Sequence, residues 1–186
     1  MTNRERFFQL CDKIDRQGMT DLFEWLEEHS DFFTAPASTK YHGAYDGGLL
    51  EHSLNVYDAL VKLLTVYPEI QASEESIVIV SLFHDLCKVN MYEKETRYRK
   101  DANGQWEPYE AYTHNELLHY GGHGSKSVFI LQNFIKLTPE EAVAINCHMG
   151  SWEDNHNVGE AFEHCHLAWL LHVADESATF ITEVKR

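Results

Sequence analysis

Long apolar runs, paired-cysteine motifs and an excess of basic residues are all missing from this chain of 186 residues. The longest apolar stretches fall short of the 18 or so residues that cross a membrane, so no membrane association is expected. The N-terminus lacks the apolar centre of a signal peptide, and we therefore expect a cytoplasmic protein. Cys11, Cys87, Cys147 and Cys165 show no CxxC spacing, which indicates reduced thiols and neither a disulfide framework nor a zinc finger.

Positive charge is scarce, because 15 basic residues stand against 30 acidic ones and give a formal net charge of −15. Duplex nucleic acid is bound largely through neutralisation of its phosphates, so it is not an expected partner. A small anionic substrate is compatible with this charge if a metal ion supplies a local positive field. Twelve histidines are many for the length, and histidine is the commonest metal ligand in proteins.

The composition, 44% hydrophobic and 12% aromatic, predicts one folded domain with a sizeable core. Apolar residues recur at helical spacing through most of the chain. This periodicity predicts an all-α fold with helices over residues 3–15, 19–29, 48–66, 73–87, 128–135, 138–147 and 159–183.

One segment departs from the helical pattern. Residues 92–114 are rich in β-prone side chains around Asn103-Gly104, which predicts a small β-hairpin insert around residues 95–112. Arg97 and Arg99 belong to the densest basic cluster of the chain. That cluster is either a solvated face of the hairpin, the commoner case, or a flap that meets a substrate phosphate.

The stretch around His84-Asp85 carries the strongest chemical hint. The pair closes the apolar run 77–83, and Lys88 follows three residues later. A carboxylate at the end of such a run needs a partner, because an unpaired charge is costly in a core. A helix end that happens to carry histidine and aspartate is the simpler explanation, so the metal hypothesis depends on further ligands elsewhere.

Further ligands are present on other segments. His52 lies on the inward face of its predicted helix, His123 stands between glycines near a helix start, and His148 ends a helix. Asp175 is a lone carboxylate among apolar helical residues, where burial is costly. The candidate metal ligands are therefore His52, His84, Asp85, His123, His148 and Asp175.

Six imidazole and carboxylate ligands exceed the four of a tetrahedral zinc site. The set suits divalent Mn, Fe, Co, Ni, Mg or Zn, with no preference for thiolate. We expect a centre of two metal ions, with Asp85 as the bridging carboxylate.

The order His52, His84-Asp85, Asp175 resembles the H…HD…D pattern of the HD superfamily of metal-dependent phosphohydrolases. The flanks, residues 47–54 and 171–175, are similar to those of the family. The additional His123 and His148 resemble the six-ligand, two-metal subgroup, which includes phosphodiesterases.

This resemblance covers about residues 41–180 and implies one HD-type helical bundle spanning 1–186. Within it, residues 1–40 would form an N-terminal helical extension and residues 41–183 the HD core. The insert at 92–114 departs from the family pattern, which implies no role for it.

The implied activity is hydrolysis of a phosphoester in a nucleotide, a cyclic nucleotide or a related small phosphorylated substrate, by a metal-activated water. Asp85 and Lys88 are the candidate catalytic residues. His119 and His172, with Glu51 and Asn55, are candidates for orienting the ligands. The candidate substrate contacts are Lys88, Lys126, Arg97, Arg99, His42 and Trp152.

Two other functions are compatible with the same residues. Some members of the fold hold two irons and activate dioxygen, so an HD-fold di-iron oxygenase is the alternative enzyme. A non-catalytic module that binds a nucleotide is the alternative from another class. The complete ligand set argues against it, because a pure sensor could lose ligands without penalty.

Overall fold

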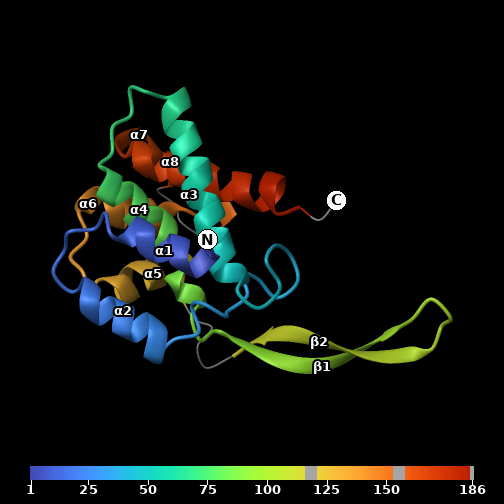
Figure 1. Cartoon of the computed structure of the whole chain (residues 1–186). Helices are drawn as coiled ribbons and strands as arrows, with labels where there is room; N and C mark the ends of the chain where they lie inside the picture. The colour runs from blue at the N-terminus through green and yellow to red at the C-terminus, as the bar shows by residue number, and fades with distance from the viewer. Residues whose placement is uncertain (116–120, 153–157, 185–186) are drawn as a thin grey trace.

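The computed structural model describes residues 1–115, 121–152 and 158–184 and is mainly helical, with one projecting hairpin (Figure 1). Among these residues, no helix is long and apolar enough to cross a membrane. Single turns of other helix types lie at Leu86–Lys88, Gly150–Trp152 and, as a π-helical turn, Ala178–Thr182. The α-helices are α1 (Asn3–Cys11), α2 (Met19–Glu28), α3 (Gly48–Val66), α4 (Glu74–Phe83), α5 (His123–Leu131), α6 (Pro139–Cys147), α7 (Val158–His164) and α8 (His166–Ser177).

The core forms where α3 packs against α4 and α8, while α6 packs against α8 and α5. The expected N-terminal extension is built into this same core. Phe7 of α1 is fully buried, and its ring centroid lies 5.3 Å from that of Phe32 and 5.8 Å from that of Phe83. The aromatic contacts therefore tie the first helix directly to the end of α4, next to His84.

Several helix ends differ from the sequence predictions. The helix predicted to about residue 87 ends at Phe83, so His84 caps it and Asp85 (φ −105°, ψ 22°) has left the helical region. Neighbours on a continuous helix diverge by about 100°, whereas this turn lets the two side chains converge. α1 ends at Cys11, whereas its predicted end was residue 15. α5 ends at Leu131, whereas its predicted end was Ile135.

The predicted C-terminal helix, residues 159–183, is also divided. It breaks at Cys165 (φ −132°, ψ 87°) between α7 and α8, and α8 then passes into the π-helical turn. The wider π-helical turn changes the direction in which the last residues point. Helical periodicity alone could not reveal either change, because the apolar spacing continues through both.

The hairpin agrees with the prediction and is slightly longer. Strands β1 (Tyr92–Lys100) and β2 (Trp106–His114) pair antiparallel, from Tyr92 with His114 to Lys100 with Trp106. The loop between them closes through the Asp101 amide, which donates to the Gln105 carbonyl at 2.8 Å, and Gly104 adopts φ +80°. Figure 1 shows that the hairpin extends away from the helical body.

Candidate metal centre

Four separate elements bring five of the six predicted ligands together around Asp85. His52 comes from the second turn of α3, His84 and Asp85 from the end of α4, His148 from the end of α6 and Asp175 from α8. The three imidazoles and the Asp85 carboxylate are almost completely buried, while 14% of the Asp175 side chain is exposed. Such a concentration of buried polar groups demands a physical reason.

Asp85 lies at the middle of this group. Its Oδ2 is 3.4 Å from His84 Nε2 and 3.6 Å from His52 Nε2, and its Oδ1 is 3.5 Å from His148 Nε2. Asp175 closes the other side, with Oδ1 3.1 Å from His52 Nε2. The three Nε2 atoms therefore converge on two carboxylates.

The other nitrogen of each imidazole is held by an acceptor. His84 Nδ1 donates to the Ser81 carbonyl at 2.9 Å, and His148 Nδ1 donates to the Ile145 carbonyl at 2.6 Å. His52 Nδ1 is 3.0 Å from Glu183 Oε1. Each ring is thus anchored at Nδ1 and presents Nε2 to the centre.

The three Nε2 atoms are buried and make no hydrogen bond of acceptable geometry. Buried polar atoms without partners are rare, because each one forfeits its interaction with water. Imidazoles that ligate a metal are typically anchored through the opposite ring nitrogen in this way. The donor set and the open Nε2 atoms therefore fit a divalent metal ion.

The possible ligand atoms fall into overlapping groups, each within 4.8 Å. His52, His84 and Asp85 form one group, and His84, His148 and Asp175 form another. The predicted ligand His123, the first residue of α5, joins a different group with Asp85 and Cys87. Asp85 therefore belongs both to the group with His52 and to the group with His123, as a bridging carboxylate would.

Cys87 was not predicted as a site residue. Its amide donates to Ser127 Oγ at 3.0 Å, and burial raises the pKa of its thiol to about 12. A protonated thiol is a weak ligand. The turn Leu86–Lys88 places Cys87 beside the centre. The sequence around Cys87 gave no indication of this position.

Charge in the centre is balanced by Lys88, whose Nζ lies 2.5 Å from Asp85 Oδ2. Burial raises the pKa of Asp85, but Lys88 and His84 outweigh it and hold that pKa well below the usual range. Burial likewise lowers the pKa of His52, yet Asp175 and Glu183 together raise it to about 9. The centre thus stabilises cationic groups, as a metal site of this composition should.

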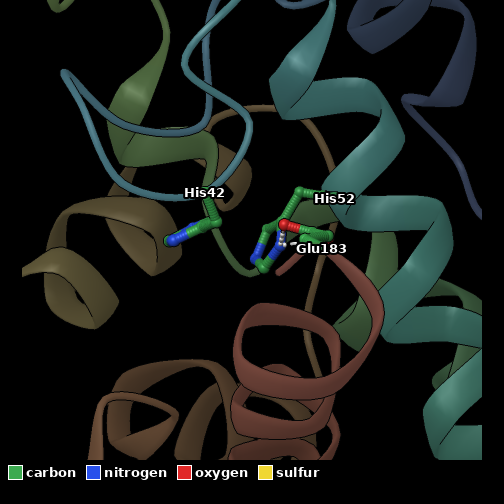
Figure 2. A group of neighbouring side chains, drawn as sticks. All are labelled: His42, His52 and Glu183. Atoms are coloured by element: carbon green, nitrogen blue, oxygen red, sulfur yellow. Dashed lines mark hydrogen bonds and ion pairs between the residues drawn. The ribbon is translucent and has the colours of Figure 1, made fainter. Parts of the chain in front are cut away.

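His42 and Glu183 come from other segments of the chain, and Figure 2 shows both beside His52 of α3. The His42 ring centroid is 4.8 Å from that of His52, and its buried Nε2 has no hydrogen-bond partner. Burial, followed by the charges of His52 and Lys88, lowers the pKa of His42 to about 4. Glu183 escaped the sequence analysis because it follows the last apolar turn, where a glutamate is ordinarily solvated.

Glycines allow the backbone to approach closely at two places near the centre. A Cβ on Gly48 would lie 2.0 Å from the Gly43 carbonyl oxygen, so the loop that carries His42 can pack tightly on the start of α3. Gly150 adopts φ +57°, and a Cβ there would lie 2.6 Å from the His172 ring. His172 Nδ1 in turn donates to the His148 carbonyl at 2.7 Å, which secures the segment after that ligand.

The remaining predicted substrate contacts lie in different surroundings. Lys126 is half-buried on α5, and burial lowers its pKa. Arg97 and Arg99 are not brought to the centre, because they lie on the projecting hairpin and pair there with Glu95 and Glu107.

Trp152 is 71% exposed, and its Nε1 donates to Glu176 Oε1 at 3.0 Å. Its bulk therefore faces solvent and leaves the imidazole cluster without an aromatic wall from this residue. The predicted ligand-orienting residue His119 lies outside the described residues.

A cavity of about 320 Å³ lies between the base of the hairpin and the loop that precedes α3. Tyr92, which lines it, also interacts electrostatically with Lys88 and Asp85. The cavity is therefore near the cationic side of the centre. Its lining consists of Asp31, Thr34, Ala35, Pro36, Asp46, Tyr92, Lys94 and Tyr112.

Comparisons with known proteins give one informative relative. The chain is similar to the dihydroneopterin 2′,3′-cyclic phosphate phosphodiesterase of Methanocaldococcus jannaschii, with 25% identity over 175 residues. The alignment covers 92% of this chain and 60% of that relative, so the chain spans less than two thirds of the relative's length. No family model matches the chain, and no solved structure matches it.

Proposed function

We propose that this chain is a metal-dependent phosphohydrolase of the HD type, which cleaves a phosphoester in a small phosphorylated substrate. The observation that carries the proposal is the convergence of three buried Nε2 atoms, none with a hydrogen-bond partner, on Asp85 and Asp175. The similarity to a phosphodiesterase that acts on a cyclic phosphate supports the reaction class. A cyclic phosphodiester is therefore the first substrate class to test.

The proposed ligands are those predicted from the sequence: His52, His84, Asp85, His123, His148 and Asp175. Asp85 would be shared between two ions, because it belongs both to the group with His52 and His84 and to the group with His123. When bound, such ions lower the pKa of a coordinated water and neutralise charge on the phosphoryl oxygens.

The chain's own cationic residues have a separate task. Lys88 is buried, and in the absence of metal it neutralises Asp85. We assign to Lys88 and Lys126 the binding of substrate phosphate as point charges; Lys88 pairs with Asp85, and Lys126 interacts electrostatically with Cys87. His42 supplies a neutral imidazole beside His52, and its open Nε2 suits a hydrogen bond with the substrate.

The rest of the substrate has a natural place in the cavity at the base of the hairpin. Tyr92 and Tyr112 give this cavity aromatic walls, and Lys94 with Asp46 adds polar groups. Such a lining suits a planar, partly polar ring system. Arg97, Arg99 and Trp152 stay predictions from the sequence, since their side chains are engaged elsewhere.

Metal analysis coupled to a substrate panel tests this function. The purified protein would be loaded separately with Mn²⁺, Fe²⁺, Ni²⁺ and Zn²⁺ and assayed on a 2′,3′-cyclic nucleotide, a nucleoside monophosphate and triphosphate, and a linear phosphodiester. We expect bound metal and turnover of at least one substrate. His84→Ala should lose both by at least about 100-fold, because its Nε2 points to the centre.

The matched control is His164→Ala, which removes an exposed histidine of α7 and should leave metal content and turnover unchanged. His123→Ala should reduce the metal stoichiometry without emptying the centre. Activity with Mn²⁺ under argon separates hydrolysis from the oxygenase alternative, which requires iron and dioxygen. If the metal-loaded protein leaves every phosphoester intact, the proposed function is wrong.

A further inference from the structure

Glu183 is a buried carboxylate at the far end of the chain from its partner. Only 6% of its side chain is exposed, and its Oε1 and Oε2 lie 3.0 Å and 3.2 Å from His52 Nδ1. Asn55 Nδ2, one turn after His52 on α3, donates to Glu183 Oε1 at 2.9 Å. Figure 2 shows the carboxylate lying against the His52 ring.

His52 needs such an acceptor for a reason that follows from its place in a helix. His84 and His148 stand at helix ends, where each Nδ1 reaches the carbonyl three residues earlier. Carbonyls at the last turn of a helix lack the amide four residues ahead that would occupy them inside the helix, so they can accept from a side chain. His52 lies inside α3, where the backbone carbonyls are already used by the helix. Its Nδ1 must therefore be held by a side chain from another element.

The π-helical turn brings that side chain into place. α8 and the turn Ala178–Thr182 both pack against α3, and the Glu183 amide donates to the Ala178 carbonyl at 2.9 Å. π-helical turns are rare and recur at functional sites. Here the turn ends the helix and directs Glu183 back towards α3, where an α-helical continuation would follow another course.

The charge of Glu183 suits this contact. Its two oxygens lie 3.0 Å and 3.2 Å from His52 Nδ1, and Oε1 also accepts from the Asn55 amide. An ionised carboxylate at Nδ1 fixes the tautomer and orientation of an imidazole and increases the basicity of Nε2. The same contact also offsets the burial of the carboxylate itself.

We propose that Glu183 is the positioning residue of the metal centre: it holds Nδ1 of His52 so that Nε2 is directed at the ion, and Asn55 holds Glu183. This inference rests on the proposed function, because it takes the centre to bind metal. Loss of such an anchoring group typically weakens metal binding by about 10–100-fold. The C-terminal residues are then part of the site, although they follow the last predicted ligand by eight positions.

Mn²⁺ affinity, measured by competition with a chromophoric chelator, tests the proposal without depending on activity. Glu183→Ala should weaken Mn²⁺ binding by about 10–100-fold. Glu183→Gln keeps an acceptor oxygen and loses the charge, so its Mn²⁺ affinity should lie between those of wild type and Glu183→Ala. Asn55→Ala should change affinity in the same direction and by less. Glu163→Gln, a charge-matched change at an exposed position of α7, should leave it unaltered.

A purely structural role would look different. It would lower the urea midpoint of the chelator-treated protein while leaving Mn²⁺ affinity of the folded form within twofold of wild type, and that result overturns the proposal. If Glu183→Ala does not fold, Glu183→Gln and Asn55→Ala decide the question by the same measurement. Wild-type protein that binds no metal would sink the proposed function as well, whereas tight binding by every variant would sink only the role of Glu183.

Discussion

Two clusters of buried charge can be compared within this chain. One is the candidate metal centre, at the C-terminal ends of α4 and α6. The other, at the N-terminal ends of the same two helices, joins Arg16 with Glu75 and Glu141. Glu141 is completely buried, as are His84 and His148. Both clusters therefore contain completely buried ionisable side chains, and they differ in how the polar atoms of these side chains are satisfied.

Every oxygen of Glu141 is used. Arg16 donates to both of them, at 2.6 Å and 2.8 Å, and Ser76 Oγ and the Thr138 amide donate at 2.7 Å and 2.9 Å. Arg16 also binds the Lys136 carbonyl at 2.9 Å. At the metal centre, by contrast, three Nε2 atoms are left without hydrogen bonds.

The difference separates two uses of buried polar groups. A closed network such as that of Arg16 specifies packing, because removal of one member leaves the others uncompensated. An open cluster retains unused ligand capacity and carries a cost until something binds. Burial alone therefore does not identify a functional site, whereas burial combined with open, convergent atoms does.

The largest effect on stability should come from the closed network. Glu141→Gln keeps the shape and removes the charge that Arg16 faces, so the free energy of unfolding should fall by about 3 kcal/mol. Urea denaturation in the presence of a chelator measures it. Mn²⁺ affinity of the folded protein should stay within twofold of wild type.

The pH dependence provides the control for Glu141. Burial raises its pKa, but the bonds from Arg16 and the Thr138 amide hold it below the model-peptide value of 4.5. Its contribution to stability is therefore complete above pH 4.5 and declines as the pH falls through the lower folded-state pKa. The stability curves of wild type and Glu141→Gln should converge in acid. Parallel curves would contradict the role of this charge.

At the candidate metal centre, a substitution should change Mn²⁺ binding and the stability gained from it. At Mn²⁺ concentrations of 100 times the Kd, binding should raise the unfolding free energy of wild type by about 2.7 kcal/mol. His148→Ala removes an open Nε2, so at the same concentration it should gain almost nothing. Thermal unfolding with and without metal gives both values. Glu141→Gln should keep the full gain, and a loss there would erase the distinction between the clusters.

Features of the fold and of the candidate site could be predicted from the sequence where they depend on residues that are close together in the chain. The spans of α3 and α6 followed from helix chemistry and were predicted to within one residue. The five converging side chains could be found because each was a polar residue at a helix end or on an inward face. His123 also reaches Asp85, from the side of Cys87.

Other features depended on tertiary geometry. Glu183 reaches His52 only because a π-helical turn redirects the chain, and the apolar spacing continues through that turn. The end of α4 at Phe83 likewise could not be placed, because apolar residues resume at Leu86 and Cys87 after the His84-Asp85 pair. Arg97 and Arg99 looked suited to phosphate by charge alone, and the sequence did not reveal that they form ion pairs with Glu95 and Glu107 on the hairpin.

Substitution of a hairpin arginine should have the smallest effect on the free energy of unfolding, because these charges are exposed and belong to neither buried cluster. The side chain of Arg99 is 65% exposed, and its Nε donates to Glu107 Oε1 at 2.7 Å. Exposed pairs contribute little, so Arg99→Ala should change the unfolding free energy by less than about 0.5 kcal/mol. KM for the best phosphoester substrate should be unchanged as well. A several-fold rise in KM without loss of stability would instead show that the hairpin meets the substrate, and the role in phosphate binding predicted from the sequence would be restored.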